Sequence, residues 1–155
     1  MNGHEDLTRS TRKLQLLVVD DEPNVCECLK LILALDGHDV ATANSGRDGI
    51  ELFRSRRFDV VCTDYSMPGM RGDEFAAGIK ALRPDQPIVM ISGLAGTLEK
   101  PAGVDYILSK PFFPNDLRLA LRAVMQSTGR TERHAFDSVC AADQPESGEE
   151  FGMSV

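Results

Sequence analysis

Five short apolar segments, separated by polar or amphipathic stretches, constrain the fold of this chain most strongly. The segments cover residues 14–19, 38–43, 58–64, 88–91 and 104–109. Apolar residues recur at helical spacing in four other stretches, at residues 23–37, 45–57, 72–82 and 115–125. Strands that alternate with helices are typical of a parallel sheet with right-handed crossovers. We therefore predict an α/β fold with a five-stranded parallel sheet and helices on both faces.

Local signals mark several helix ends. Pro23 fits the first turn of a helix, where its missing N–H costs nothing, and Gly37 suits the end of the same helix. Residues 45–48 resemble a capping box that opens the next helix. In contrast, residues 94–103 contain two glycines, one proline and little helical periodicity. We expect the helix between the fourth and fifth strands to be short or missing.

Length and charge limit the possible classes of protein. The 155 residues favour one domain, which we place at residues 14–126 after a mobile leader at residues 1–13. The net charge of −7 does not favour nucleic acid or a membrane surface, and no apolar run approaches a bilayer span. The N-terminus also lacks the apolar core of a signal peptide. We expect a cytoplasmic protein that binds neither DNA nor membranes.

Residues 127–155 differ in composition from the rest of the chain. They show no periodicity and hold six acidic and two basic side chains. Because they have too little apolar surface to offset the entropy of ordering, we interpret them as a disordered acidic tail. A docking peptide around Phe151 and Met153 is the alternative. Nothing after Met125 is long or apolar enough for a DNA-binding helix-turn-helix, so we expect no output domain.

The four cysteines have no metal-binding or redox spacing. Cys26 and Cys28 are two residues apart on a predicted helix, so they point to different faces. No CxxC pair and no histidine cluster accompanies them. Reduced structural thiols are therefore favoured over a metal or redox site.

Polar residues follow four of the predicted strands at the point where each strand ends. These residues are Asp20 and Asp21, Asp64, Ser92 and Lys110. In a parallel sheet all four strand ends lie along the same edge, where open α/β sheets place their binding sites. Three carboxylates, one hydroxyl and one ammonium are therefore expected around one crevice.

The chemistry of such a cluster is specific. Three neighbouring carboxylates repel one another unless one is protonated or a cation joins them, and Mg²⁺ suits carboxylate ligands with water. Lys110 can pair with a phosphoryl oxygen and Ser92 can donate a hydrogen bond to another. Asp64 would then be an oxygen nucleophile surrounded by groups that stabilise charge. The pattern predicts phosphoryl transfer onto an aspartate.

Residues 14–125 resemble the receiver domain of two-component response regulators. The motifs that carry the resemblance are Val18-Val19-Asp20-Asp21-Glu22-Pro23, Asp64-Tyr65-Ser66-Met67-Pro68-Gly69-Met70-Arg71-Gly72, Ser92-Gly93 and Lys110-Pro111-Phe112. The resemblance implies a flavodoxin-like receiver fold that acts in signal transduction. It also implies a cis bond between Lys110 and Pro111, and space for the phosphoryl group beside Gly93.

The resemblance also implies a role for each site residue. Asp64 would accept a phosphoryl group from a histidine kinase or a histidine phosphotransfer protein. Asp21, Asp64 and the backbone carbonyl of Ser66 would bind Mg²⁺ directly, with Asp20 acting mainly through water. Ser92 would be the switch hydroxyl, and Lys110 would contact the phosphoryl group. Such a protein would signal to an unknown downstream protein by contact or by phosphorelay, as a phosphoacceptor and not as a turnover enzyme.

Two features depart from the receiver pattern. Three positions before the lysine, where many receivers carry an aromatic switch residue, this chain has Ile107. Tyr106 is one place earlier and should project to the opposite face of its strand, where we expect it to pack under a helix. The segment between Ser92 and Lys110 is also about one helical turn shorter than usual, which puts the family's common dimer surface in doubt. Residues 94–103 would then form a mobile loop that orders on phosphorylation or on partner binding.

Two other functions remain open. A phosphorylation-independent protein-binding module on the same fold would explain the altered switch position, but would not need the five site residues. A phosphatase with an aspartate nucleophile normally carries that residue after its first strand. Here adjacent acids follow the first strand, and the lone Asp64 follows the third.

Overall fold

The computed structural model describes residues 12–94 and 96–127. The strands are β1 (Gln15–Val19), β2 (Asp39–Ala43), β3 (Val60–Asp64), β4 (Ile88–Ser92) and β5 (Tyr106–Ser109). The helices are α1 (Pro23–Leu35), α2 (Gly46–Ser55), α3 (Gly72–Leu82) and α4 (Pro114–Ser127). Most of the predicted leader and tail lies outside the described residues. Within the described part, no helix is both long and apolar enough to cross a membrane.

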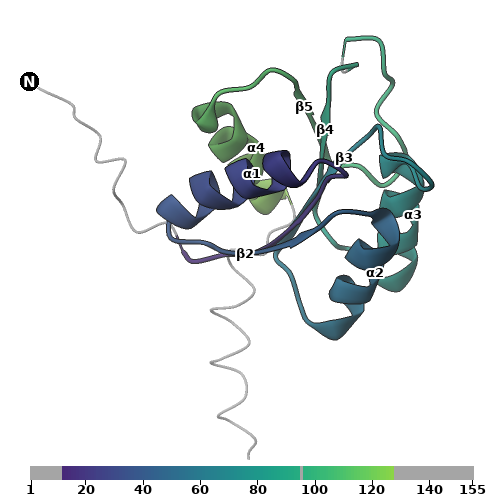
Figure 1. Cartoon of the computed structure of the whole chain (residues 1–155), viewed down its shortest axis with the longest axis horizontal. Coiled ribbons are helices and arrows are strands. Elements are labelled where there is room, and N and C mark those ends of the chain that lie inside the picture. Colours follow the sequence, from purple (N-terminus) through teal and green to yellow (C-terminus); the bar gives the residue numbers. More distant parts are fainter. Residues whose placement is uncertain (1–11, 95, 128–155) are drawn as a thin grey trace, which may run out of the picture.

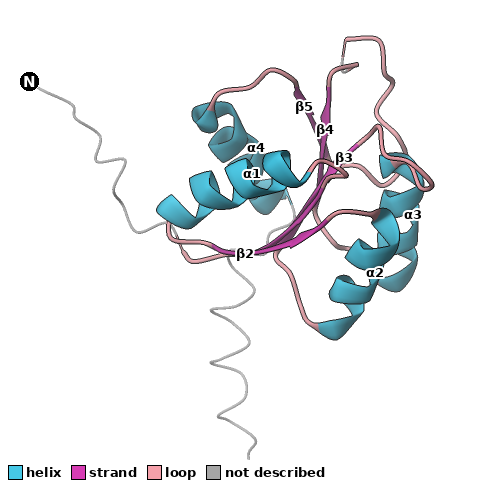
Figure 2. Ribbon diagram, in the orientation of Figure 1, coloured by secondary structure: helices cyan, strands magenta, loops and turns pink. Residues whose placement is uncertain are grey.

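The five strands form one parallel sheet in the order β2-β1-β3-β4-β5. Helices α1 and α4 cover one face and helices α2 and α3 cover the other, as Figures 1 and 2 show. The chain therefore has the predicted three-layer α/β architecture. Because the sheet is parallel, the carboxyl ends of all five strands lie along one edge.

The buried faces explain why the strands read as continuous apolar runs. Along β1, Leu16 and Val18 pack toward α1 and α4, whereas Leu17 and Val19 pack toward α2 and α3. Every residue of the central strands β3 and β4 is buried. Strands buried on both faces need apolar side chains at successive positions, since neither face meets water.

No helix separates β4 from β5 among the described residues, which form turns and loops there. This agrees with the prediction of a short or missing helix. The loop is still attached to the body of the protein, because Leu98 packs against the core on the α2 and α3 side. At its end, Asp105 accepts the Ile88 N–H at 2.8 Å and pairs with Lys80 at 3.2 Å.

Strand β5 places its first two side chains on opposite faces of the sheet. Tyr106 packs toward α1 and α4, and Ile107 packs toward α2 and α3. The interpretation of Tyr106 as a side chain packed under a helix is therefore confirmed. Ile107 alone occupies the face on which a switch residue would lie.

The end of α1 is closed by the backbone of a glycine. Gly37 has a φ of +88°, a conformation that L side chains rarely adopt. Its N–H donates to Ala34 at 3.0 Å, and the N–H of His38 donates to Leu33 at 3.1 Å. These two bonds form the Schellman arrangement that ends many helices, in agreement with the prediction from sequence.

A glycine also determines how closely α3 approaches β3. The N–H of Gly72 donates to the Tyr65 carbonyl at 2.8 Å. A side chain at this position would collide with the carbonyl oxygen of Asp64 and would lie 2.8 Å from the Cα of Tyr65. Only glycine lets α3 begin against the end of the strand that carries Asp64.

We predict that Gly72→Ala destabilises the fold by about 1–3 kcal/mol or more, because backbone atoms must move to accept the new methyl group. The matched control is Gly78→Ala in the same helix, where the new Cβ would lie 3.2 Å from the Cδ1 of Ile50, the end of a flexible side chain. That change should be neutral or stabilise by up to about 1 kcal/mol, since alanine is the better helix former. Urea denaturation measures both, and equal effects would contradict the close-approach explanation.

The stability of the fold should depend on pH through His38. His38 accepts the Leu14 N–H on its Nδ1 at 3.1 Å, which requires the neutral ring. Burial lowers the pKa of His38 below its ordinary 6.5, although Asp36 and Asp59 oppose this shift. Below pH 6.5 His38 therefore takes up a proton more readily in the unfolded chain than in the folded chain. The contribution of neutral His38 to the free energy of unfolding therefore falls as the pH falls. At higher pH the contribution is complete.

His38→Asn provides the comparison, because its side-chain oxygen can accept a hydrogen bond and does not titrate. Denaturation curves of both proteins across this range should show the original chain losing stability relative to the variant as the solution is acidified. Parallel pH profiles would show that His38 is not held neutral.

Candidate functional site

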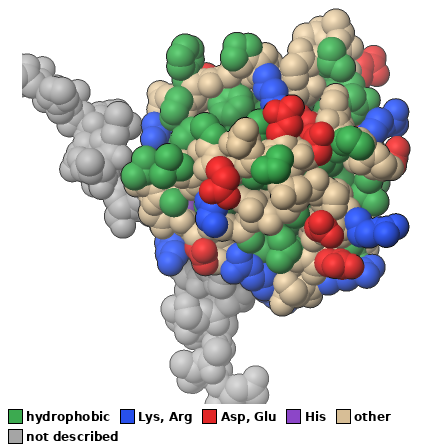
Figure 3. All heavy atoms as spheres, viewed as in Figure 1, with side chains coloured by type: hydrophobic (Ala, Val, Ile, Leu, Met, Phe, Trp, Pro, Cys, Tyr) green, Lys and Arg blue, Asp and Glu red, His purple; other side chains and the backbone are tan. Residues whose placement is uncertain are grey.

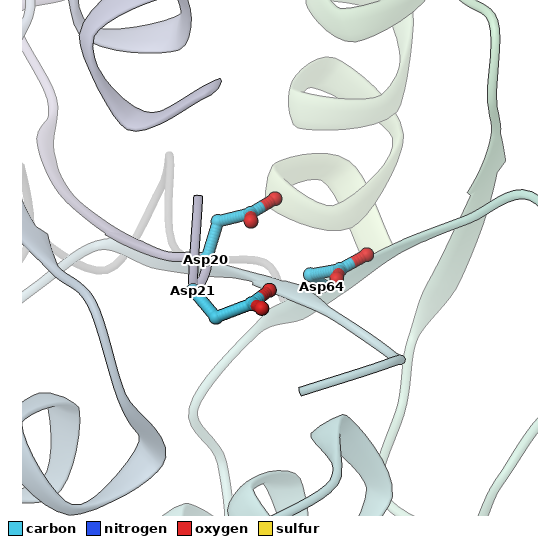
Figure 4. A group of neighbouring side chains, drawn as sticks. All are labelled: Asp20, Asp21 and Asp64. Carbon is cyan, nitrogen blue, oxygen red and sulfur yellow. The ribbon is translucent and has the colours of Figure 1, made fainter. Parts of the chain in front are cut away.

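The structure brings the predicted site residues to one edge of the sheet. Asp20 and Asp21 directly follow β1, and Asp64 is the last residue of β3. Ser92 is the last residue of β4, and Lys110 directly follows β5. Figure 4 shows the carboxylates of Asp20, Asp21 and Asp64 gathered where β1 and β3 end. The convergence follows from the parallel strand order, which places β1, β3 and β4 side by side.

The three aspartates form a compact cluster. One carboxylate oxygen from each lies within 4.8 Å of the others, and Asp20 and Asp64 are only 3% and 7% exposed. Burial raises the pKa of Asp20, and the nearby charge of Asp64 adds to the effect. The Glu22 N–H, which donates to Asp20 Oδ1 at 2.9 Å, and the charge of Lys110 oppose the shift. The cluster thus holds more negative charge than its surroundings neutralise.

Lys110 supplies the positive charge nearest to the cluster. Its Nζ donates to Asp64 Oδ1 at 3.0 Å and lies 3.6 Å from Asp20 Oδ2. Burial lowers the pKa of Lys110, but the hydrogen bond to Asp64 and the charges of Asp64 and Asp20 raise it by more. The net shift is upward, so the side chain is a permanent ammonium at neutral pH. The peptide bond between Lys110 and Pro111 is cis, as the sequence motif implied.

Ser92 lies at the same edge but is bonded differently from the carboxylates. Its side chain is buried and accepts the Leu94 N–H at 3.0 Å. This bond uses a lone pair of the oxygen and leaves the hydroxyl able to donate. The Ser92 backbone carbonyl accepts the Lys110 N–H at 2.9 Å, which ties the ends of β4 and β5 together. Next to it, an added Cβ at Gly93 would meet no described atom within 4 Å.

The donor set fits a hard divalent cation. The ammonium of Lys110 offsets the charge of one carboxylate, and a divalent cation would offset the other two. Carboxylate oxygens are the ligands that Mg²⁺ prefers, usually in combination with water. Ser66 lies two residues beyond Asp64 in the exposed loop before α3, close in the chain to the cluster.

Sequence reasoning missed one polar contact at the site. Thr63 is fully buried, and its hydroxyl donates to the backbone carbonyl of Asp64 at 2.9 Å. This carbonyl is the group against which Gly72 packs. The position of Thr63, directly before the last residue of an apolar strand, could have indicated this hydrogen bond. Threonine is also a common strand residue, so its presence there is not specific.

Comparison with known proteins identifies the family. The family model for the response regulator receiver domain matches residues 16–122. The probable transcriptional regulator ycf27 of Guillardia theta is 34% identical over 131 residues, which cover 81% of this chain and 50% of the relative. The cell cycle response regulator CtrA of Brucella ovis is 25% identical over 134 residues, which cover 84% of this chain and 56% of the relative. This chain therefore spans about half the length of the curated relatives it matches.

The solved structures agree with this result. The response regulator TrrA of Thermotoga maritima, in a complex with Mg²⁺ and BeF, is 31% identical, with a TM-score of 0.66. The match covers 73% of this chain and 99% of that one. A receiver domain from Clostridium thermocellum is 28% identical with a TM-score of 0.69, over 76% of this chain and 98% of that one. Sequence, fold and aspartate cluster lead to the same conclusion: the chain belongs to the response regulator receiver domain family of two-component signalling.

Proposed function

We propose that this receiver domain accepts a phosphoryl group on Asp64 from a phosphohistidine of a histidine kinase or histidine phosphotransfer protein. The observation that carries the proposal is the hydrogen bond from Lys110 to Asp64 at 3.0 Å, made beside two further carboxylates. A buried carboxylate held next to a fixed ammonium and a potential metal site is arranged for attack on phosphorus.

The proposed transfer is a direct displacement. A carboxylate oxygen of Asp64 forms a bond to phosphorus while the bond from phosphorus to the donor's imidazole nitrogen breaks. The electron pair of the broken bond stays on that nitrogen, which takes up a proton. Lys110 then pairs with an oxygen of the new acyl phosphate, and the Ser92 hydroxyl donates to another.

Asp20, Asp21, Asp64 and the backbone carbonyl of Ser66 are the groups that would hold Mg²⁺. When bound, the ion would neutralise charge that develops on the phosphoryl oxygens. The solved structure of TrrA, with Mg²⁺ and BeF, supports this assignment, since that protein shares the receiver fold and 31% of its matched residues with this chain.

The proposed output is a change in protein contacts or the onward relay of the phosphoryl group. Ser92 and Ile107 lie on neighbouring strands, with Ser92 paired to Ser109 and Met90 paired to Ile107. A shift of the Ser92 hydroxyl toward the phosphoryl group would therefore first displace residues of β5 and of the loop that begins at Leu94. We place this protein in the cytoplasm, where the domain would meet its kinase and its downstream protein.

A protein-binding module that works without phosphorylation is the competing function, and the altered switch position favours it. Incubation with Mg²⁺ and acetyl phosphate separates the two proposals. We predict a single phosphoryl adduct by intact mass, mapped to Asp64, absent in Asp64→Asn and absent when the metal is chelated. Asp73→Asn, on an acid outside the cluster, is the matched control and should still be labelled. A chain that stays unlabelled while still folded would favour the binding module, and sustained release of phosphate from a monoester would favour a phosphatase.

The role of Lys110 can be separated from that of the metal ligands. We predict that Lys110→Ala slows labelling of Asp64 by about 10²-fold or more, as expected when a donor is removed from a charged transition state. The affinity for Mg²⁺ should stay the same or rise, because the ammonium at 3.0 Å from Asp64 repels a second cation. Lys100→Ala, in the loop before β5, is the control. A loss of Mg²⁺ affinity equal to the loss of rate would show that Lys110 only maintains the structure of the cluster.

A further inference from the structure

Four arginines gather at the end of α2 and α3, on the edge of the sheet opposite the aspartates. We define this arginine cluster by the residues Arg54, Arg56, Arg57 and Arg83. Three of these belong to the last turn of α2 or to the link into β3, and the fourth directly follows α3. Figure 3 shows basic side chains, with some acidic ones between them, on the side of the molecule where α2 and α3 lie.

Two of the guanidinium groups are held in place by aromatic rings. Arg56 lies 4.9 Å from the centre of the Phe58 ring, and Arg83 lies 4.8 Å from the centre of the Phe53 ring. The two rings stack with their centres 6.4 Å apart, and both are buried. Planar groups fixed in this way lose little entropy when they bind an anion.

Among the described residues, the three arginines at the end of α2 (Arg54, Arg56 and Arg57) form one ion pair between them. Arg56 approaches Asp39 at 3.9 Å, which is at the outer limit for an ion pair. In a chain with a net charge of −7, such a cluster is a local excess of positive charge. It would attract a carboxylate-rich segment.

The chain itself carries such a segment. Residues 134–155 contain five carboxylates and no lysine or arginine; the five are Asp137, Asp143, Glu146, Glu149 and Glu150. This segment follows α4 (Pro114–Ser127), which begins beyond Lys110 at the aspartate edge and runs toward the edge of the sheet where α2 ends (Figure 1). Nine residues lie between Ser127 and Asp137, and the ten steps along the chain can span roughly 33 Å. That distance exceeds the roughly 20 Å from the α4 layer, across the sheet, to the α2 layer on the other face.

We propose that residues 134–155 bind to the arginine cluster of the same chain. Exposed ion pairs are individually weak, so a free acidic peptide would bind this surface poorly. A tethered segment has an effective concentration in the millimolar range. At that concentration several weak ion pairs are enough to hold the segment on the arginine cluster. The aspartate cluster lies at the opposite edge, so the bound segment leaves it open to a phosphate donor.

The cysteines of the chain allow a direct test. Cys26 and Cys62 are buried and Cys28 is exposed, so a nitroxide can be attached to Cys140 alone in a Cys28→Ser variant. At low salt, the label should broaden the amide signals of residues 54–58 and of Arg83 in the full chain. Signals of Gly46 and Arg47, at the other end of α2, should stay sharp.

The expected broadening has three controls. It should disappear in about 1 M salt, where the Debye length is about 3 Å. It should also disappear in a double variant with Arg54→Glu and Arg57→Glu, and in a variant whose five tail carboxylates are replaced by amides. Arg47→Glu, the same change at the opposite end of the helix, should leave it intact. Labelling of Asp64 by acetyl phosphate verifies that each variant is folded and should be unchanged.

Three outcomes would overturn the proposal. The first is the absence of broadening at residues 54–58 at low salt. The second is broadening that both arginine variants reduce equally, which would reflect net charge and not the cluster. The third is broadening of a ¹⁵N-labelled chain by a separate spin-labelled chain, which would assign the contact to a second copy.

Discussion

The hydrogen bond between Lys110 and Asp64 joins the ends of two strands that are not neighbours. β3 and β5 are separated by β4, so the bond at 3.0 Å spans the ends of three adjacent strands. The Lys110 N–H also binds the carbonyl at the end of β4, at 2.9 Å. The ammonium partly neutralises a cluster of acids that would otherwise repel one another. The same contact that stabilises the buried aspartates would also, in the proposed function, hold Asp64 in place for attack on phosphorus.

The position of Asp64 depends on the backbone as much as on its neighbours. The strand that ends in Asp64 is buried throughout. The backbone carbonyl of Asp64 accepts a hydrogen bond from the hydroxyl of Thr63. Gly72 then allows α3 to pack directly against that carbonyl. These contacts fix the end of β3 against the first turn of α3. The carboxylate is therefore presented from a rigid element, as the proposed phosphoryl transfer to Asp64 would require.

The edge strand β5 is less enclosed than the inner strands β1, β3 and β4. The connection from β4 to β5 contains no helix in the part that the structure describes, and Ile107 remains partly exposed. Leu98 and the pair of Lys80 with Asp105 hold this loop against the body of the domain. Phosphorylation would thus act on a surface made of a loop and a strand. A partner protein that binds here would contact a loop, where a receiver with a helix between β4 and β5 would present that helix.

Much of the fold was predictable from the order of apolar segments. Fully buried parallel strands need continuous apolar runs, and β1, β3 and β4 carry them. Helix ends were predictable where a local interaction determines them. Ser45 accepts the Asp48 N–H at 3.1 Å, and Gly37 has the positive φ that the end of α1 requires. The strand limits differed by one or two residues at Leu14, His38, Phe58, Ser92 and Val104, because pairing with the neighbouring strand determines where a strand begins and ends.

The sequence by itself determined which chemical groups reach the edge of the sheet, because each follows an apolar run directly. It therefore predicted that Asp20, Asp21, Asp64, Ser92 and Lys110 lie together at this edge, where the structure places them. Only the tertiary structure decided the contacts among them. It bonded Lys110 to Asp64 at 3.0 Å and placed the same ammonium 3.6 Å from Asp20. It also stacked two arginines on a pair of rings at the far edge. Contacts between groups far apart in the sequence depend on strand order and helix packing, which no local pattern encodes.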